Sequence, residues 1–252
     1  MEKKKKERAD ILLAVSGLCE SRELAKKLIM AGKVKVGTDH LVRKPSDKFT
    51  TDTVFNIKEK MPFVSRGAYK LLPALDKYLP DLSGLTSIDI GASTGGFTDL
   101  MLQRGLNKAF TIDSGRGQLH LKLRNNPKVT CLEKTNARYI TQELIGDKAD
   151  VMVMDVSFIS VTKLLIPCTN LLKNNSWAFI LIKPQFEAEK SEISHGGVVR
   201  NPEVHQKTID KIVTFAHNNT DLNLIEVIKS PITGPKGNIE FMSVFRKIDN
   251  CQ

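Results

Sequence analysis

A glycine-rich segment follows the apolar run that contains Asp89, and its residue types suit a ligand-binding turn. Glycines stand at Gly91, Gly95 and Gly96, and apolar residues return at helical spacing from Phe97 onward. This pattern predicts a buried strand that enters a helix through a tight turn. Glycine permits positive φ and a close approach of the backbone to a ligand. The amides at the start of the helix can bind a carboxylate or a phosphate.

The spacing of these glycines narrows the choice of ligand. A dinucleotide fingerprint, G-x-G-x-x-G, needs a middle glycine, and that position is Ser93 in this chain. A P-loop needs Gly-Lys-Ser/Thr, which does not follow. The pattern present, D-x-G-x-x-x-G-G-F, resembles the first motif of S-adenosylmethionine (SAM) methyltransferases, in which the acidic residue and the glycines surround the methionine part. A glycine-rich turn that binds nothing remains the alternative.

Further polar residues follow the next two predicted strands. An apolar run at residues 109–112 ends at Asp113, 22 residues after Gly91. A carboxylate about 20 residues after the glycine turn, at the end of the second strand, accepts ribose hydroxyls in nucleotide-binding folds. Residues 129–132 are predicted to form a third strand, after which Asn136 is expected to meet the adenine. Without a nucleotide, Asp113 would be an ordinary turn residue.

Two more buried strands are predicted, one in residues 151–158 with Asp155 toward its carboxyl end and one in residues 177–187 that ends in Lys183. Strands that alternate with helical segments form a doubly wound parallel sheet, whose ligands bind outside the carboxyl ends of the strands. A final hairpin that ends with residues 239–245 would add one antiparallel strand. The predicted class is α/β, with a Rossmann-like methyltransferase sheet. Four candidate residues then lie on its ligand edge: Gly91, Asp113, Asp155 and Lys183.

The N-terminal part of the chain is the most basic. Residues 1–60 contain 15 lysines and arginines against 9 acidic residues, which is +6 of the +10 carried by the 252 residues. This excess predicts a polyanionic partner, with nucleic acid ahead of a membrane surface. A lysine-rich surface that serves only solubility would have the same composition.

A small α+β domain is predicted within this basic part. Apolar residues at helical spacing predict two short helices, the second capped by Ser21, and short strands follow. The patterns R-x-D-x-x-L, S-R-x-x-A-x-x-x-I and G-x-V-x-V resemble the alpha-L RNA-binding motif first described in a small-subunit ribosomal protein. The resemblance implies that basic side chains contact RNA phosphates, which carry little sequence information. These residues are Arg22, Lys26, Lys27, Lys33 and Lys35, and Arg66 is expected to join them from the next segment.

Cysteine usage and hydropathy bear on the compartment. The 4 cysteines are scattered without a C-x-x-C pair, so neither a zinc site nor a disulfide framework is expected, and no metal is predicted. A reducing cytoplasm fits this usage. The basic start at residues 3–6 is not followed by the apolar stretch and cleavage site of a signal peptide. No apolar run of about 18 residues is present, so no stable membrane association is expected.

Five motifs in combination cover nearly the whole chain. They are Ser-Arg-Gly-Ala-Tyr-Lys-Leu, Asp-Ile-Gly-Ala-Ser-Thr-Gly-Gly-Phe-Thr-Asp, Asp-Val-Ser-Phe-Ile-Ser, Leu-Ile-Lys-Pro-Gln-Phe-Glu and Lys-Gly-Asn-Ile-Glu. Together they resemble the TlyA (hemolysin A) family of ribosomal RNA 2′-O-methyltransferases, whose catalytic domain is similar to the heat-shock methyltransferase FtsJ. The resemblance implies SAM as the cofactor, ribosomal RNA or ribosomal subunits as the partner, and cytidine as the target.

Carried over by motif, four residues match the Lys-Asp-Lys-Glu tetrad of 2′-O enzymes: Lys70, Asp155, Lys183 and Glu240. Gly95, Phe97 and Asp113 match SAM contacts. Two departures bear on cofactor affinity. Phe97 replaces the tryptophan of FtsJ, and Asn136 stands where an acidic contact to adenine is expected.

The chemistry of a 2′-hydroxyl agrees with this tetrad. The strand end after Asp155 lacks the two prolines of enzymes that methylate base amines, and no cysteine stands nearby for C5 methylation. A ribose hydroxyl is a poor nucleophile and must lose its proton. Lysine, with a usual pKa of about 10.4, is protonated at neutral pH, whereas a second lysine and partial burial lower a lysine pKa. We expect Lys183 to be the base, Asp155 and Glu240 to hold it, and Lys70 to steer the nucleotide and its phosphate. Ordinary surface lysines are the alternative.

The polar segment at residues 58–62 ends in proline and is predicted to separate two domains. Residues 1–61 would form the RNA-binding domain and residues 62–252 the methyltransferase domain.

Two other function classes compete with the prediction of an RNA methyltransferase. One is a membrane-lytic protein, which the historical family name suggests but no amphipathic stretch of the chain supports. The other is an inactive module that binds SAM and RNA, against which the intact tetrad argues.

Overall fold

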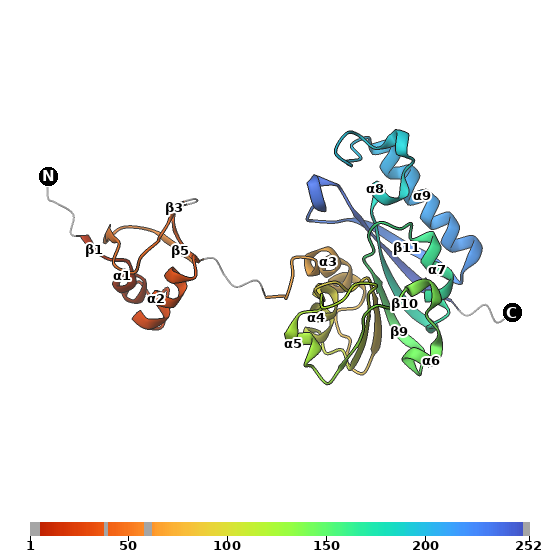
Figure 1. The fold of residues 1–252 in the computed structure, drawn as a ribbon, viewed down its shortest axis with the longest axis horizontal. Helices are drawn as coiled ribbons and strands as arrows, with labels where there is room; N and C mark the ends of the chain where they lie inside the picture. Colours follow the sequence, from red (N-terminus) through yellow and green to blue (C-terminus); the bar gives the residue numbers. More distant parts are fainter. Residues whose placement is uncertain (1–5, 38–39, 58–61, 249–252) are drawn as a thin grey trace. The chain divides into compact units, whose positions relative to one another are not determined.

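The computed structural model describes residues 6–37, 40–57 and 62–248 (Figure 1). The chain divides into two compact units, Met1–Pro62 and Phe63–Gln252. The predicted polar join lies outside the described residues at 58–61. Among the described residues, no helix combines the length and the apolar character that crossing a membrane requires.

The first unit packs two helices against short strands. The helices are α1 (Ala9–Val15) and α2 (Arg22–Met30), and the Ser21 hydroxyl accepts a hydrogen bond from Leu24 N at 3.2 Å, so the predicted cap is confirmed. β2 (Val34–Val36) pairs with β3 (His40–Leu41) and β5 (Phe55–Ile57). A separate pair, β1 (Lys6–Arg8) with β4 (Lys48–Thr50), was not predicted, because the first strand is wholly charged and the second holds one apolar residue, so neither shows an apolar pattern.

The second unit is built on one sheet of seven strands in the order β11-β12-β10-β9-β6-β7-β8. β12 runs antiparallel to both of its neighbours, and the other pairs are parallel. The predicted sheet and its single antiparallel strand are therefore confirmed. The strands are β6 (Thr86–Ile90), β7 (Lys108–Ile112), β8 (Val129–Leu132), β9 (Ala149–Met154), β10 (Leu172–Ile182), β11 (Leu222–Lys229) and β12 (Phe241–Lys247).

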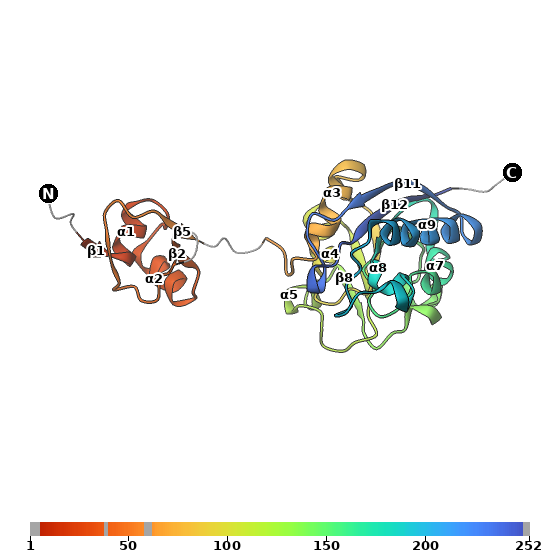
Figure 2. The ribbon, with the colours of Figure 1, turned by 90° about the horizontal axis from the view of Figure 1, so that it is seen from above.

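Helices cover both faces of this sheet (Figures 1 and 2). Successive side chains of a strand point to opposite faces. Val151 and Val153 of β9 pack with one set of helices, while Met152 and Met154 pack with the other. The first set is α3 (Ala68–Tyr78) and α4 (Gly96–Gln103), and the second is α7 (Thr162–Thr169) and α9 (Pro202–Asn219).

Short helices complete the unit. They are α5 (Leu121–Arg124), α6 (Gln142–Ile145), α8 (Pro184–Glu187) and the 3₁₀ helices η1 (Ala137–Tyr139), η2 (Lys190–Glu192) and η3 (Pro235–Gly237).

One helix begins later than the sequence predicts. The sequence of residues 64–72 predicts a helix capped by Ser65, but α3 starts at Ala68 without a side-chain cap. The preceding residues pack against α4 instead. Val64 N donates to the Asp99 carboxylate at 2.8 Å, and a side chain at Gly96 would meet the Ser65 hydroxyl. Contacts between distant parts of the chain thus take precedence over the local capping preference.

Candidate active site

Lys70, Asp155, Lys183 and Glu240 meet at the carboxyl edge of the sheet. Lys70 Nζ lies 2.7 Å from Glu240 Oε2 and 3.3 Å from Asp155 Oδ2. Lys183 Nζ lies 2.5 Å from Asp155 Oδ1 and donates to Ser157 Oγ at 2.8 Å. Asp155 therefore contacts both lysines, each through a different carboxylate oxygen.

The topology explains this meeting. Asp155 and Lys183 directly follow the parallel strands β9 and β10, and Glu240 directly precedes the antiparallel strand β12. Because Ile182 pairs with Phe241 in antiparallel register, the end of β10 and the start of β12 lie at the same edge. Lys70 reaches this edge from the first turn of α3. The side chain of Glu240 is fully buried, and those of Lys70 and Lys183 are 10% and 8% exposed.

Glu240 holds a different lysine from the one expected. The sequence predicts that both carboxylates hold Lys183, but Glu240 forms its ion pair with Lys70. Gln185 Nε2 donates to the other carboxylate oxygen, Glu240 Oε1, at 3.3 Å. A side chain at Gly234 would overlap this oxygen, so the glycine leaves the room that the carboxylate occupies. α3 brings Lys70 to Glu240 because segments distant in the sequence pack together. No local sequence pattern predicts such a contact.

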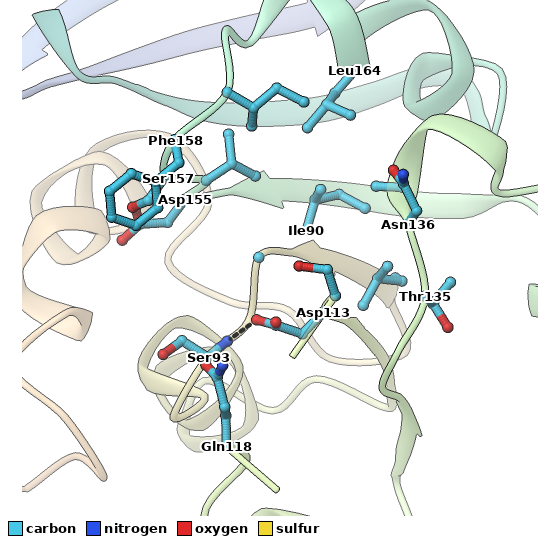
Figure 3. A pocket seen from close by; sticks show the side chains of 16 residues that line it. Ile90, Ser93, Asp113, Gln118, Thr135, Asn136, Asp155, Ser157, Phe158 and Leu164 are labelled. Atoms are coloured by element: carbon cyan, nitrogen blue, oxygen red, sulfur yellow. Dashed lines mark hydrogen bonds between the residues drawn. The ribbon is translucent and has the colours of Figure 1, made fainter. Parts of the chain in front are cut away.

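Two adjoining cavities open at this edge. The larger, about 670 Å³, is lined by the tetrad residues Lys70, Asp155 and Lys183 and by the glycine turn. The smaller, about 380 Å³, lies beyond Asp155, between the ends of β6, β7 and β9 (Figure 3). The residues that line both are Gly91, Ser93, Asp155, Ser157 and Phe158. A ligand that spans both cavities would thus pass beside Asp155.

Asp113 and Asn136 line the smaller cavity, as Figure 3 shows. The Asp113 carboxylate accepts hydrogen bonds from Ser93 N at 2.8 Å and Gly115 N at 2.7 Å. Asn136 Oδ1 accepts from Arg138 N at 3.1 Å and caps η1. Both side chains therefore also order the loops that form this cavity.

The three glycines of the turn allow close packing within the chain. Gly91 has φ 79°, and a Cβ there would lie 2.6 Å from the Asp155 carbonyl oxygen. Gly95 has φ 92°, and its Cβ would overlap Leu123. Gly96 faces Ser65. The sequence predicts that these glycines make room for a ligand. In the structure they leave room for neighbouring segments of the chain, and Gly91 and Gly96 also line the larger cavity.

Asp89 is a buried carboxylate beneath the glycine turn, and it lines the larger cavity. Thr98 Oγ1 donates to its Oδ2 at 2.6 Å, and its Oδ1 has no hydrogen-bond partner among the described residues. Burial raises the pKa of Asp89 to about 7. Phe97, predicted as a cofactor contact, packs mainly into the core between α3 and the sheet and borders the same cavity.

The predicted RNA contacts of the first unit differ in their surroundings. Arg22 is exposed but is paired at 2.9 Å with Asp10, which is fully buried. Lys26 pairs with Glu23 at 2.7 Å, whereas Lys27 is exposed. Lys33 and Lys35 are half-buried beside or within β2. In the second unit, Arg66 is exposed and lines the larger cavity.

Phe158 is a site residue that the sequence analysis missed. This residue is 92% exposed, its φ is 64°, and it lines both cavities. Its ring centroid lies 5.1 Å from that of Phe186. An aromatic residue next to a buried strand is ordinarily assigned to the core, so only the structure shows that this ring faces the site.

The chain matches two family models. Residues 63–247 match the FtsJ-like methyltransferase model, and residues 7–54 match the S4 domain model. This chain belongs to the FtsJ-like methyltransferase family and carries an S4 domain at its N-terminal side.

Relatives of similar length share both parts. The 16S/23S rRNA (cytidine-2′-O)-methyltransferase TlyA of Mycobacterium tuberculosis is 38% identical over 236 residues, which cover 93% of this chain and 87% of that protein. Hemolysin A of Brachyspira hyodysenteriae is 37% identical over 241 residues, which cover 94% and 99%. A solved structure from Streptococcus thermophilus, described as a hemolysin, has a TM-score of 0.73 at 37% identity and covers 98% of this chain and 90% of its own. The predicted family resemblance is confirmed.

Proposed function

We propose that this protein transfers a methyl group from SAM to the ribose 2′-oxygen of a cytidine in ribosomal RNA. The observation that carries the proposal is the tetrad in which Asp155 joins Lys70 and Lys183 where two cavities meet. Membership in the FtsJ-like family and the activity named for the Mycobacterium tuberculosis relative support the reaction class and the target.

The residues of the two cavities fit SAM. The free oxygen of Asp89 is a buried acceptor suited to the ammonium group of the methionine part. In the smaller cavity, Asp113 would accept the ribose hydroxyls and Asn136 would contact the adenine. SAM supplies an electrophilic methyl group when bound. The task of the protein is then to align the acceptor oxygen and to remove its proton.

Lys183 is our candidate for the base that takes this proton. Removing a proton from Lys183 leaves Asp155 still paired with Lys70, whereas removing one from Lys70 would deprive the buried Glu240 of its cation. The two hydrogens of a neutral Lys183 amine can be donated to Asp155 and Ser157. Its lone pair then points away from both and is available to the ribose hydroxyl. Ser157 is thus a positioning residue for the base.

The first unit would supply RNA affinity. The S4 domain match and the predicted phosphate contacts Arg22, Lys26, Lys27, Lys33 and Lys35 support this role, and Arg66 would extend the contact to the larger cavity. The two predicted domains would have different functions. Residues 1–61 would bind RNA, and residues 62–252 would bind SAM and carry out methyl transfer. Ribosomal subunits are the proposed partners, and the cytoplasm is the proposed place of action.

Three measurements test the proposal. Calorimetry should show SAM binding, tritiated methyl groups should pass to ribosomal RNA, and mass spectrometry should locate them on cytidine ribose. SAM and RNA binding without transfer would indicate the inactive module. Dye release from lipid vesicles without any transfer would indicate the membrane-lytic class, which the name of the Brachyspira hyodysenteriae relative raises.

A further inference from the structure

Two loops beside the smaller cavity present three basic side chains and one aromatic ring to solvent. Arg116 lies in the loop after β7, and Lys134, Arg138 and Tyr139 lie in the segment after β8. All four are exposed, and Tyr139 is 76% exposed. We call these four residues the loop surface.

The two loops are joined to each other. Lys134 N donates to Gly115 O, and Thr135 N donates to Asp113 O, each at 2.9 Å. Lys134 has φ 53°, a left-handed conformation that is costly for lysine and persists only where neighbouring contacts impose it. Arg116 and Lys134 are therefore presented from adjoining, ordered backbone, and Arg138 and Tyr139 follow Lys134 in the same segment.

No acidic residue in the described part of the chain neutralises the charges of the loop surface. Among residues 6–37, 40–57 and 62–248, no ion pair engages Arg116, Lys134 or Arg138. Neighbouring cations differ, because Lys122 pairs with Asp99 at 2.7 Å and Arg124 pairs with Glu133 at 2.5 Å. Glu133, the acidic residue next to Lys134, is thus already engaged.

We infer that the loop surface binds a single-stranded segment of RNA, with the three cations on phosphates and a base stacked on Tyr139. Exposed cations beside an exposed aromatic ring are the means by which proteins bind single strands. The inference rests on the proposed function for its partner. It adds a contact region in the second unit that borders the cofactor end of the site, in addition to the proposed contacts of the S4 domain and of Arg66.

The test measures RNA binding by the full chain in the absence of SAM, at several salt concentrations. The probes are a labelled 20-nucleotide cytidine oligomer and a 20-base-pair RNA duplex. Each single-strand phosphate contact contributes about 0.7 to the slope of log affinity against log salt, so Arg116→Gln, Lys134→Gln and Arg138→Gln together should lower the slope by about 2. Tyr139→Ala should weaken binding of the oligomer about 5- to 100-fold and leave the slope unchanged, whereas Tyr139→Phe should bind normally.

Lys229→Gln is the matched control, because Lys229 is exposed on β11 at the opposite edge of the sheet from β8. Thermal unfolding checks that each variant is folded. An unchanged slope in the triple variant, or equal losses for oligomer and duplex in Tyr139→Ala, would overturn the inference. RNA binding is measured independently of methyl transfer, so the two proposals can fail separately. If the variants showed these losses but the wild-type protein transferred no methyl group, the inference on the loop surface would stand and the proposed function would be refuted.

Discussion

The Glu240 carboxylate occupies the space that a side chain at Gly234 would require. Replacing this glycine by alanine should displace the carboxylate that pairs with Lys70, although no charged group is altered. We therefore expect Gly234→Ala to lower the single-turnover methyl-transfer rate at least 10-fold, with SAM affinity retained, because misplacing a catalytic group is costly even over short distances.

A double-mutant cycle provides the control for Gly234. In a Glu240→Ala background the space is already free, so adding Gly234→Ala should change the residual rate little. If the two losses simply multiplied, the overlap between Gly234 and Glu240 would not be the cause.

The two lysines should respond differently to arginine. Lys183→Arg keeps the charge but cannot lose its proton, so we expect the transfer rate to fall about 10²- to 10⁴-fold while SAM and RNA affinities persist. Lys70→Arg retains a cation between Asp155 and Glu240 and should keep more of the rate. Single-turnover rates at saturating SAM and RNA make the comparison. The reverse order of rates would assign the base to Lys70.

Ser157 tests how the base is oriented. Ser157→Ala removes the hydroxyl that accepts from Lys183 and should lower the transfer rate about 10-fold, the effect of one lost hydrogen bond of about 1.5 kcal/mol to a charged group. Ser157→Thr keeps the hydroxyl and should restore the rate. If Ser157 had only a structural role, Ser157→Ala would lower the melting temperature. We expect no such change, because Ser157 is exposed.

Asp89 links stability to pH. Burial raises the pKa of its carboxyl to about 7, so between pH 4 and 7 the folded state holds a proton that the unfolded chain releases. This contribution to stability is complete below about pH 4 and is lost as the pH rises through 7. Asp89→Asn removes the effect, so the variant should melt at a higher temperature than the wild type at pH 8 and show a smaller difference at pH 5. Its SAM affinity should fall about 10-fold or more, because a charged hydrogen bond is lost.

Variants of Arg22 and Lys27 should distinguish an effect on folding stability from an effect on RNA binding. Arg22 pairs with buried Asp10, whose pKa is lowered to about 2 mainly by its hydrogen bond to Arg8 and further by Arg22. Arg22→Ala should cost about 1.5–3 kcal/mol of stability in the first unit, whereas Lys27→Ala should weaken RNA binding alone. The stabilisation from Asp10 is present above about pH 4 and is lost as the pH falls toward 2, so the Arg22→Ala defect should fade in acid. Denaturant unfolding and RNA titration of both variants measure the two effects.

Local sequence patterns were sufficient for much of the fold. The apolar runs before Asp113, Asp155 and Lys183 predicted parallel strands, and parallel strands place their carboxyl ends at one edge. The N-cap at Ser21 was also predictable, because a cap depends on residues three apart. The common edge of the candidate residues follows from these patterns, while their roles in cofactor and RNA binding stay predictions.

The partner of each charged side chain was decided only by the tertiary structure. Glu240 pairs with Lys70, which lies 170 residues earlier in the chain, because α3 packs against the sheet and carries Lys70 to its edge. Gly91, Gly95 and Gly96 make room for Asp155, Leu123 and Ser65, and the ring of Phe158 is exposed at the junction of the cavities. Periodicity reports which residues are buried along one element, but it carries no information on which atoms of another element fill the adjoining space.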